Sequence, residues 1–118
     1  MKKFLLPAAL LLLLPACGHA ACKASDFSVQ NFRVKGAVGH SVGVVGELVN
    51  HCATPASAQI LVVAKNSAGD VIASKKAWPA GTSNITPGKS LQFNLGRLFR
   101  YRPTMERITV AIVNVRAW

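Results

Sequence analysis

Gly39, Ser41 and Gly43 match the G-x-S-x-G pattern that presents a nucleophilic serine in esterases and lipases. In those enzymes the serine stands on a sharp turn between a strand and a helix. Here the residues after Ser41 have the pattern of a strand, and the chain is too short to build the surrounding hydrolase fold. We interpret residues 39–43 as a glycine-rich connection between two strands, and we expect no catalytic residue and no enzyme activity.

The best candidates for transition-metal ligands are His40, His51 and Cys52. His51 and Cys52 are neighbours, and neighbouring side chains on a strand point to opposite faces, so one ion does not reach both. Cys52 is also lost as a ligand if it forms a disulfide. The spacing predicts histidines at strand ends, with no metal site and no cofactor.

Residues 97–107 are the most distinctive segment, because they contain four of the six arginines that follow residue 20. These four are Arg97, Arg100, Arg102 and Arg107. A guanidinium group binds phosphate in a bidentate manner, and aromatic neighbours such as Phe99 and Tyr101 add stacking or an anchor at a lipid interface. The segment therefore predicts a site for polyanions or anionic lipid. The alternative is a strand whose arginines are simply solvated.

If this segment is a strand, its geometry can be predicted. Side chains two residues apart share a face, so Arg100 and Arg102 are expected side by side, together with Leu98. Phe99 and Tyr101 are then expected on the opposite face. At least two guanidinium groups should cluster.

The cysteines favour an oxidising compartment. Cys17 follows the leading apolar run and would be either removed with an export signal or lipidated, which leaves Cys22 and Cys52 as an even pair. We predict a disulfide between Cys22 and Cys52, the alternative being two free thiols. Closure of this 30-residue loop would stabilise the domain by about 3.5 kcal/mol in the chain-entropy account.

Residues 1–20 have the features of a cleaved export signal. Lys2 and Lys3 give a positive start, and residues 4–16 form an apolar run of 13 residues, whereas about 20 are needed to span a bilayer. A cut before Ala21 would release a soluble domain of residues 21–118. Residues 14–17 also resemble a bacterial lipoprotein box, in which Cys17 would be lipidated. We expect no transmembrane helix in the mature chain.

The excess of positive charge limits the kinds of molecule that are expected to bind the protein. The chain of 118 residues has 14 lysines and arginines against 4 acidic residues, a net charge of +10 that falls to +8 without Lys2 and Lys3. After export, the polyanions within reach are anionic lipid headgroups, lipopolysaccharide and acidic cell-wall polymers. Nucleic acid is therefore not expected as a partner.

Short alternating segments follow the signal, and none has the repeat of an amphipathic helix. Six are predicted as strands: residues 27–35, 41–50, 58–65, 71–78, 90–95 and 108–115. A phase shift at Gln30 and Asn31 predicts a bulge in the first, and apolar residues on both faces predict a central position for the second. Asn66 and Gly69 predict an antiparallel hairpin between the third and the fourth. This pattern is typical of a single all-β sandwich domain.

Three stretches are similar to small exported bacterial domains of the FxLYD type: residues 46–50, the turn at residues 66–69, and residues 85–90 with Phe93. The resemblance covers about residues 42–95. The positions that give the family its name are here Val62, Ala64, Lys65 and Asn66. The resemblance implies an immunoglobulin-like antiparallel β-sandwich of six or seven strands in an extracytoplasmic setting, with no shared catalytic residues.

These features predict an exported, periplasmic and non-catalytic module that binds or supports another macromolecule of the cell envelope. Such a module would use an exposed sheet edge. The alternative is a basic protein that binds polyanions or anionic lipid surfaces through residues 97–107. In either case the protein is soluble or anchored to a membrane through Cys17.

Overall fold

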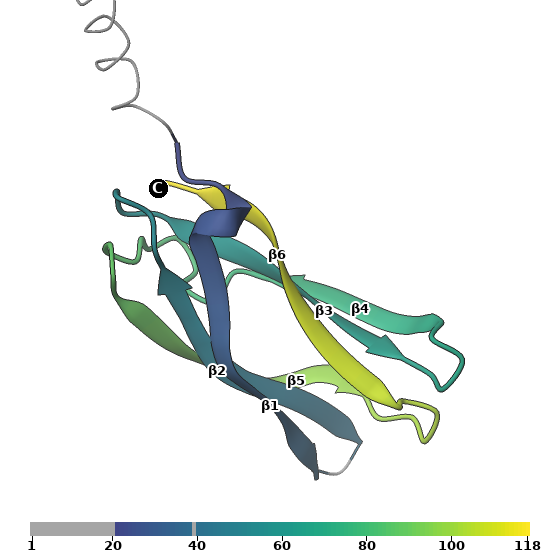
Figure 1. Ribbon diagram of the computed structural model, residues 1–118. Helices are drawn as coiled ribbons and strands as arrows, with labels where there is room; N and C mark the ends of the chain where they lie inside the picture. The colour runs from purple at the N-terminus through teal and green to yellow at the C-terminus, as the bar shows by residue number, and fades with distance from the viewer. Residues whose placement is uncertain (1–20, 39) are drawn as a thin grey trace, which may run out of the picture.

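Six antiparallel strands form two three-stranded sheets in the computed structural model, which describes residues 21–38 and 40–118 (Figure 1). The bounds are β1 Phe27–Val38, β2 Ser41–Asn50, β3 Ser57–Lys65, β4 Val71–Ala77, β5 Ser90–Arg100 and β6 Arg107–Arg116, after a short 3-10 helix, η1 Ala24–Asp26. One sheet has the order β1-β2-β5 and the other β4-β3-β6. The order is immunoglobulin-like, because β2 and β3 are central in opposite sheets and β5 returns to pair with β2. The predicted β-sandwich is confirmed.

The turns and bulges explain where the strands begin and bend. Asn31 has a positive φ of 53°, and the register between β1 and β2 shifts between Gln30 and Arg33, which confirms the predicted bulge. In the β3–β4 hairpin, the Asn66 side-chain oxygen accepts hydrogen bonds from the backbone of Ala68 and Asp70 at 3.0 and 2.9 Å. Gly69 there has a φ of 88°, so the predicted hairpin is also confirmed.

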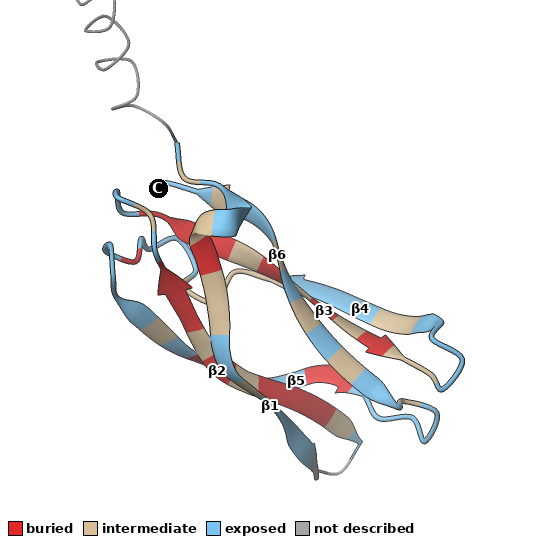
Figure 2. Ribbon diagram, in the orientation of Figure 1, coloured by how far each residue is buried: buried red, intermediate tan, exposed pale blue. Residues whose placement is uncertain are grey.

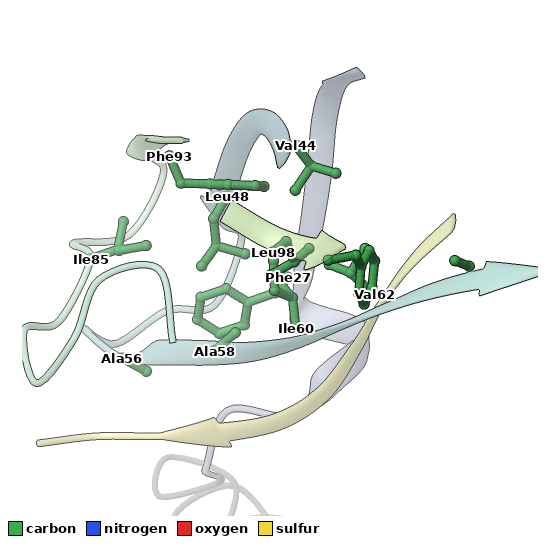
Figure 3. Close-up of a cluster of buried hydrophobic side chains, with 12 residues drawn as sticks. Phe27, Val44, Leu48, Ala56, Ala58, Ile60, Val62, Ile85, Phe93 and Leu98 are labelled. Atoms are coloured by element: carbon green, nitrogen blue, oxygen red, sulfur yellow. The ribbon is translucent and has the colours of Figure 1, made fainter. Parts of the chain in front are cut away.

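The core lies between the two central strands (Figure 3). On β2, Val44 and Leu48 are fully buried. On β3 the whole core-facing row is fully buried: Ala58, Ile60, Val62 and Ala64. Phe27 and Phe93 add aromatic volume from the edge strands of the β1-β2-β5 sheet. These apolar side chains supply the main driving force for folding, at about 25 cal/mol for each Å² of apolar surface removed from water.

β5 differs from its prediction, since it continues past residue 95 to Arg100. Val44 pairs with Leu95 and Val42 pairs with Phe99, so residues 96–98 lie opposite Gly43 alone. This bulge breaks the alternation. Leu98 and Phe99 are consecutive, yet both are buried, so the expectation that they face opposite sides of the strand is wrong.

The predicted disulfide between Cys22 and Cys52 is present, with the two Cα atoms 5.8 Å apart. It joins the segment before η1 to the loop after β2. In the described part of the chain, no helix is long and apolar enough to cross a membrane. The predicted export signal, residues 1–20, and the predicted lipidation site, Cys17, lie outside the described residues.

Candidate binding surface

The four arginines singled out in the sequence are all exposed, but they are divided among β5, the connection after it and β6. Arg97 is in the β5 bulge, and Arg100 is the last residue of β5. Arg102 lies in the connection after it, where its carbonyl oxygen accepts a hydrogen bond from Met105 N–H at 3.0 Å. Arg107 begins β6. The expectation that Arg100 and Arg102 share a strand face is therefore wrong, because the strand ends between them.

The connection between β5 and β6 also crosses from one sheet to the other. Arg100 pairs with Ser41 in the β1-β2-β5 sheet, next to the core pair of Val42 and Phe99, so its side chain belongs to the outer face of that sheet. Arg107 pairs with Lys65 in the other sheet and by the same reasoning belongs to its outer face. The guanidinium groups thus surround one end of the sandwich and do not form a flat patch.

Two backbone hydrogen bonds fix this crossing connection. Tyr101 N–H donates to the carbonyl oxygen of His40 at 2.7 Å, at the β1–β2 turn. Glu106 N–H donates to the carbonyl oxygen of Lys65 at 2.8 Å, at the start of the β3–β4 hairpin. In Figure 1 the connection lies at the end of the sandwich away from the C-terminus. The basic end is the group formed here by His40, Lys65, Arg97, Arg100, Arg102 and Arg107.

A second surface lies on the outer face of the β1-β2-β5 sheet, where a shallow groove of about 730 Å³ is lined mainly by polar side chains. Asn31 Nδ2 donates a hydrogen bond to Glu47 Oε2 at 2.9 Å. Arg33 and Asn94 lie opposite Val45 from the two flanking strands. Sequence reasoning missed this groove, although polar residues at alternate positions of β1 and β5 were a signal for it. Such amide, carboxylate and guanidinium groups can form directional hydrogen bonds with a polar ligand.

Aromatic side chains gather at the opposite end of the molecule. The rings of Trp78 and Trp118 meet edge to face with centroids 5.7 Å apart, and the Arg116 guanidinium lies 4.4 Å from the centre of the Trp118 ring. Asn84 holds the Trp118 backbone by accepting from its N–H at 2.9 Å and donating to its carbonyl oxygen at 3.2 Å. Sequence reasoning did not anticipate this cluster, because its members are far apart in the chain.

Ser41 is the first residue of β2, so a strand and not a helix follows it. Glu47 and His51 come after Ser41 in the chain order of a hydrolase triad. However, the ten residues of β2 separate Ser41 from His51 by about 30 Å. The His51 ring is instead 2.9 Å from the Ser28 hydroxyl.

The residues considered as metal ligands are also separated. His40 and His51 flank opposite ends of β2, and Cys52 is bonded to Cys22. Within residues 21–38 and 40–118, no three side chains of histidine, cysteine, aspartate or glutamate are grouped as a metal ion would need.

No family model matches this chain, and no curated protein or solved structure is significantly similar to it.

Proposed function

We propose that this protein is an exported, non-catalytic module of the bacterial cell envelope that binds an anionic macromolecular surface through the basic end. The ligand chemistry is the phosphate or carboxylate of lipid headgroups, lipopolysaccharide or acidic cell-wall polymer. The chain would act in the periplasm, either as a soluble domain or anchored to a membrane through Cys17. Its resemblance to FxLYD-type domains favours the same setting.

The observation that carries the proposal is the grouping of basic side chains from four separate segments at one end of the sandwich. The connection between β5 and β6 brings Arg100 and Arg102 beside His40, and it brings Arg107 beside Lys65. Only Asp70 and Glu106 are acidic among the residues of these turns. Exposed guanidinium groups attract anionic surfaces and bind phosphate oxygens in pairs.

Vesicle binding tests the proposal. The parent protein should bind vesicles of equimolar phosphatidylglycerol and phosphatidylcholine, and binding should fall as salt is raised. Arg100→Ala combined with Arg102→Ala should weaken binding by about 30-fold at low salt, because each cationic side chain near an anionic surface contributes about 1 kcal/mol. Lipopolysaccharide or an acidic cell-wall polymer in place of the vesicles distinguishes the three sources of anionic groups.

The matched control removes the same net charge elsewhere. Lys75→Ala combined with Lys76→Ala changes two exposed lysines near the end of β4, away from the β3–β4 hairpin, and should reduce binding much less. Equal losses in the two double variants would show that net charge alone attracts the protein. Unchanged binding after loss of both arginines, with the fold intact by circular dichroism, would contradict the proposal.

A second candidate function is binding of a partner protein at a sheet edge. It is favoured because the two edges of the β4-β3-β6 sheet are not equally protected from pairing with another strand.

A further inference from the structure

β4 and β6 are the two edges of one sheet, but they are protected very differently. β4 has seven residues and carries Lys75 opposite Val62, on the side that faces the core. Short length and inward-facing charge are devices that prevent another strand from pairing with an edge. β6 has ten residues, and its core-facing row is entirely apolar. η1 contacts β6, but by length and by core-facing charge β6 is the less protected edge.

The core-facing row of β6 is also incompletely covered. It consists of Ile108, Val110, Ile112 and Val115, which pair with Ala64, Val62, Ile60 and Ala58 of β3. Every member of the β3 row is fully buried, whereas every member of the β6 row is only half-buried. Figure 2 shows this contrast, since β6 carries no buried residue along its length. Apolar surface therefore remains exposed on the β6 side of the core.

β1 borders the same side of the sandwich, because it contacts β6 from the other sheet. Its Val29 and Phe32 pack against the core but are only half-buried, and Val34 is 46% exposed. An open pocket of about 300 Å³ lies at one end of this region, with Val34, Met105 and Ile108 in its lining. The β1–β6 seam is the strip formed by the core-facing rows of β1 and β6.

We propose that the β6 edge binds an extended segment of another protein as an added strand, with alternate apolar side chains of that segment filling the β1–β6 seam. A strand added to the sheet would lie about 4.8 Å from β6, over the seam. Its backbone would use the hydrogen-bonding groups that β6 does not share with β3, and its apolar side chains would provide selectivity.

Charge identifies the chemistry of the partner. β6 begins at Arg107 and ends at Arg116, and both side chains are exposed. A segment with acidic residues at both of its ends would place opposite charges beside these arginines. A second copy of this chain fits poorly, because symmetric antiparallel pairing of two β6 strands sets Arg107 of one against Arg116 of the other. The high positive charge of each copy opposes such a dimer further.

Synthetic peptides of the length of β6 test this proposal. In the acidic probe, valine alternates with threonine and both ends carry aspartates. One control peptide has lysines at its ends, and another has a central proline, which removes a backbone donor. The acidic probe should bind the purified protein saturably, the lysine peptide about tenfold or more weakly, and the proline peptide not measurably. Binding should slow hydrogen exchange of β6 amides and leave β4 amides unchanged.

Matched variants separate the β6 edge from a general electrostatic effect. Arg107→Glu with Arg116→Glu should reverse the preference, so that the lysine peptide binds more tightly. Lys75→Glu with Lys76→Glu makes the same charge change on β4, and this variant should still prefer the acidic probe to the lysine peptide. Val34→Ser should weaken the acidic probe by about tenfold through lost apolar contact. Val71→Ser, at an exposed valine of β4, should not.

Four results would overturn the proposal. The first is failure of the acidic probe to bind the parent protein saturably. The second is protection of β4 amides from exchange in place of β6 amides. The third is an equal shift of preference in the β4 charge variant. The fourth is self-association without peptide that protects β6, which would identify a second copy as the occupant of the edge. Circular dichroism checks that each variant retains the fold. The comparison of the three peptides uses the parent protein alone, so it tests the proposal even if a variant does not fold.

Discussion

Asn50 Nδ2 donates a hydrogen bond of 2.7 Å to the carbonyl oxygen of Ile85, which joins the end of β2 to the connection before β5. The same amide donates to the Thr54 carbonyl oxygen at 3.0 Å, and its oxygen accepts from Cys52 N–H at 2.7 Å. Asn50 is fully buried. These three hydrogen bonds of a buried side-chain amide organise the loop that carries Cys52 of the disulfide.

Asn50→Ala should therefore lower the free energy of unfolding by about 3 kcal/mol, because it leaves buried backbone groups without partners. Urea denaturation followed by tryptophan fluorescence measures the change. Asn94→Ala, on the exposed outer face of the β1-β2-β5 sheet, is the control and should stay within about 0.5 kcal/mol of the parent. Equal effects of the two variants would show that the Asn50 network has no special role.

Replacement of Cys22 and Cys52 by serine should lower the free energy of unfolding by about 3.5 kcal/mol, through the greater freedom of the unfolded chain. Chemical reduction of the parent protein should give the same shift in the denaturation midpoint. Alkylation after denaturation without reductant provides the check. Free reaction of both thiols under those conditions would contradict the bridge.

Gly43→Ala should destabilise the protein by about 2 kcal/mol or more, because a Cβ atom there would lie 2.7 Å from the carbonyl oxygen of Gly96 in the β5 bulge. Gly36→Ala is the matched control, since a Cβ atom there meets nothing within 4 Å. It should change stability by less than about 0.5 kcal/mol. Thermal denaturation of both variants gives the comparison, and a tolerated alanine at Gly43 would mean that the bulge can move away.

Ser41→Ala should leave the fold and any binding activity unchanged, because Ser41 begins a strand and His51, the histidine that follows it in the chain, contacts Ser28 at the other end of β2. Incubation with a fluorophosphonate followed by intact mass measurement tests this. Stoichiometric labelling of the parent that disappears in the variant would reveal a reactive serine after all.

Local patterns predicted most of the fold. The bounds of β2 agree with the sequence prediction, because its apolar positions and the glycine-rich segment before it are local signals. The Asn66 hairpin follows from turn chemistry. The extension of β5 to Arg100 was not predictable in this way. Its bulge depends on close approach to Gly43, more than fifty residues earlier in the chain, and a window of neighbouring residues carries no sign of it.

The residues of the basic end were largely predictable from the sequence, but their arrangement in space was not. The four arginines of residues 97–107 identified the basic segment. Their division between two sheets depends on where the chain crosses from one sheet to the other. The backbone hydrogen bonds to His40 and Lys65 determine that point. The polar groove beside Asn31 and Glu47 depends on the register of three strands. Both are properties of tertiary pairing, so no single segment encodes them.

The bond between Cys22 and Cys52 gives the domain a particular response to tension. A pull on the chain ahead of Cys22, as from a tether, passes directly to the loop after β2. Residues 23–51, with β1 and β2, lie inside the covalent loop and carry no load. Once the bridge is reduced, the same pull acts on β1, an edge strand that can peel from its neighbour one hydrogen bond at a time. Oxidation thus converts a strand that would unzip into one that is mechanically shielded.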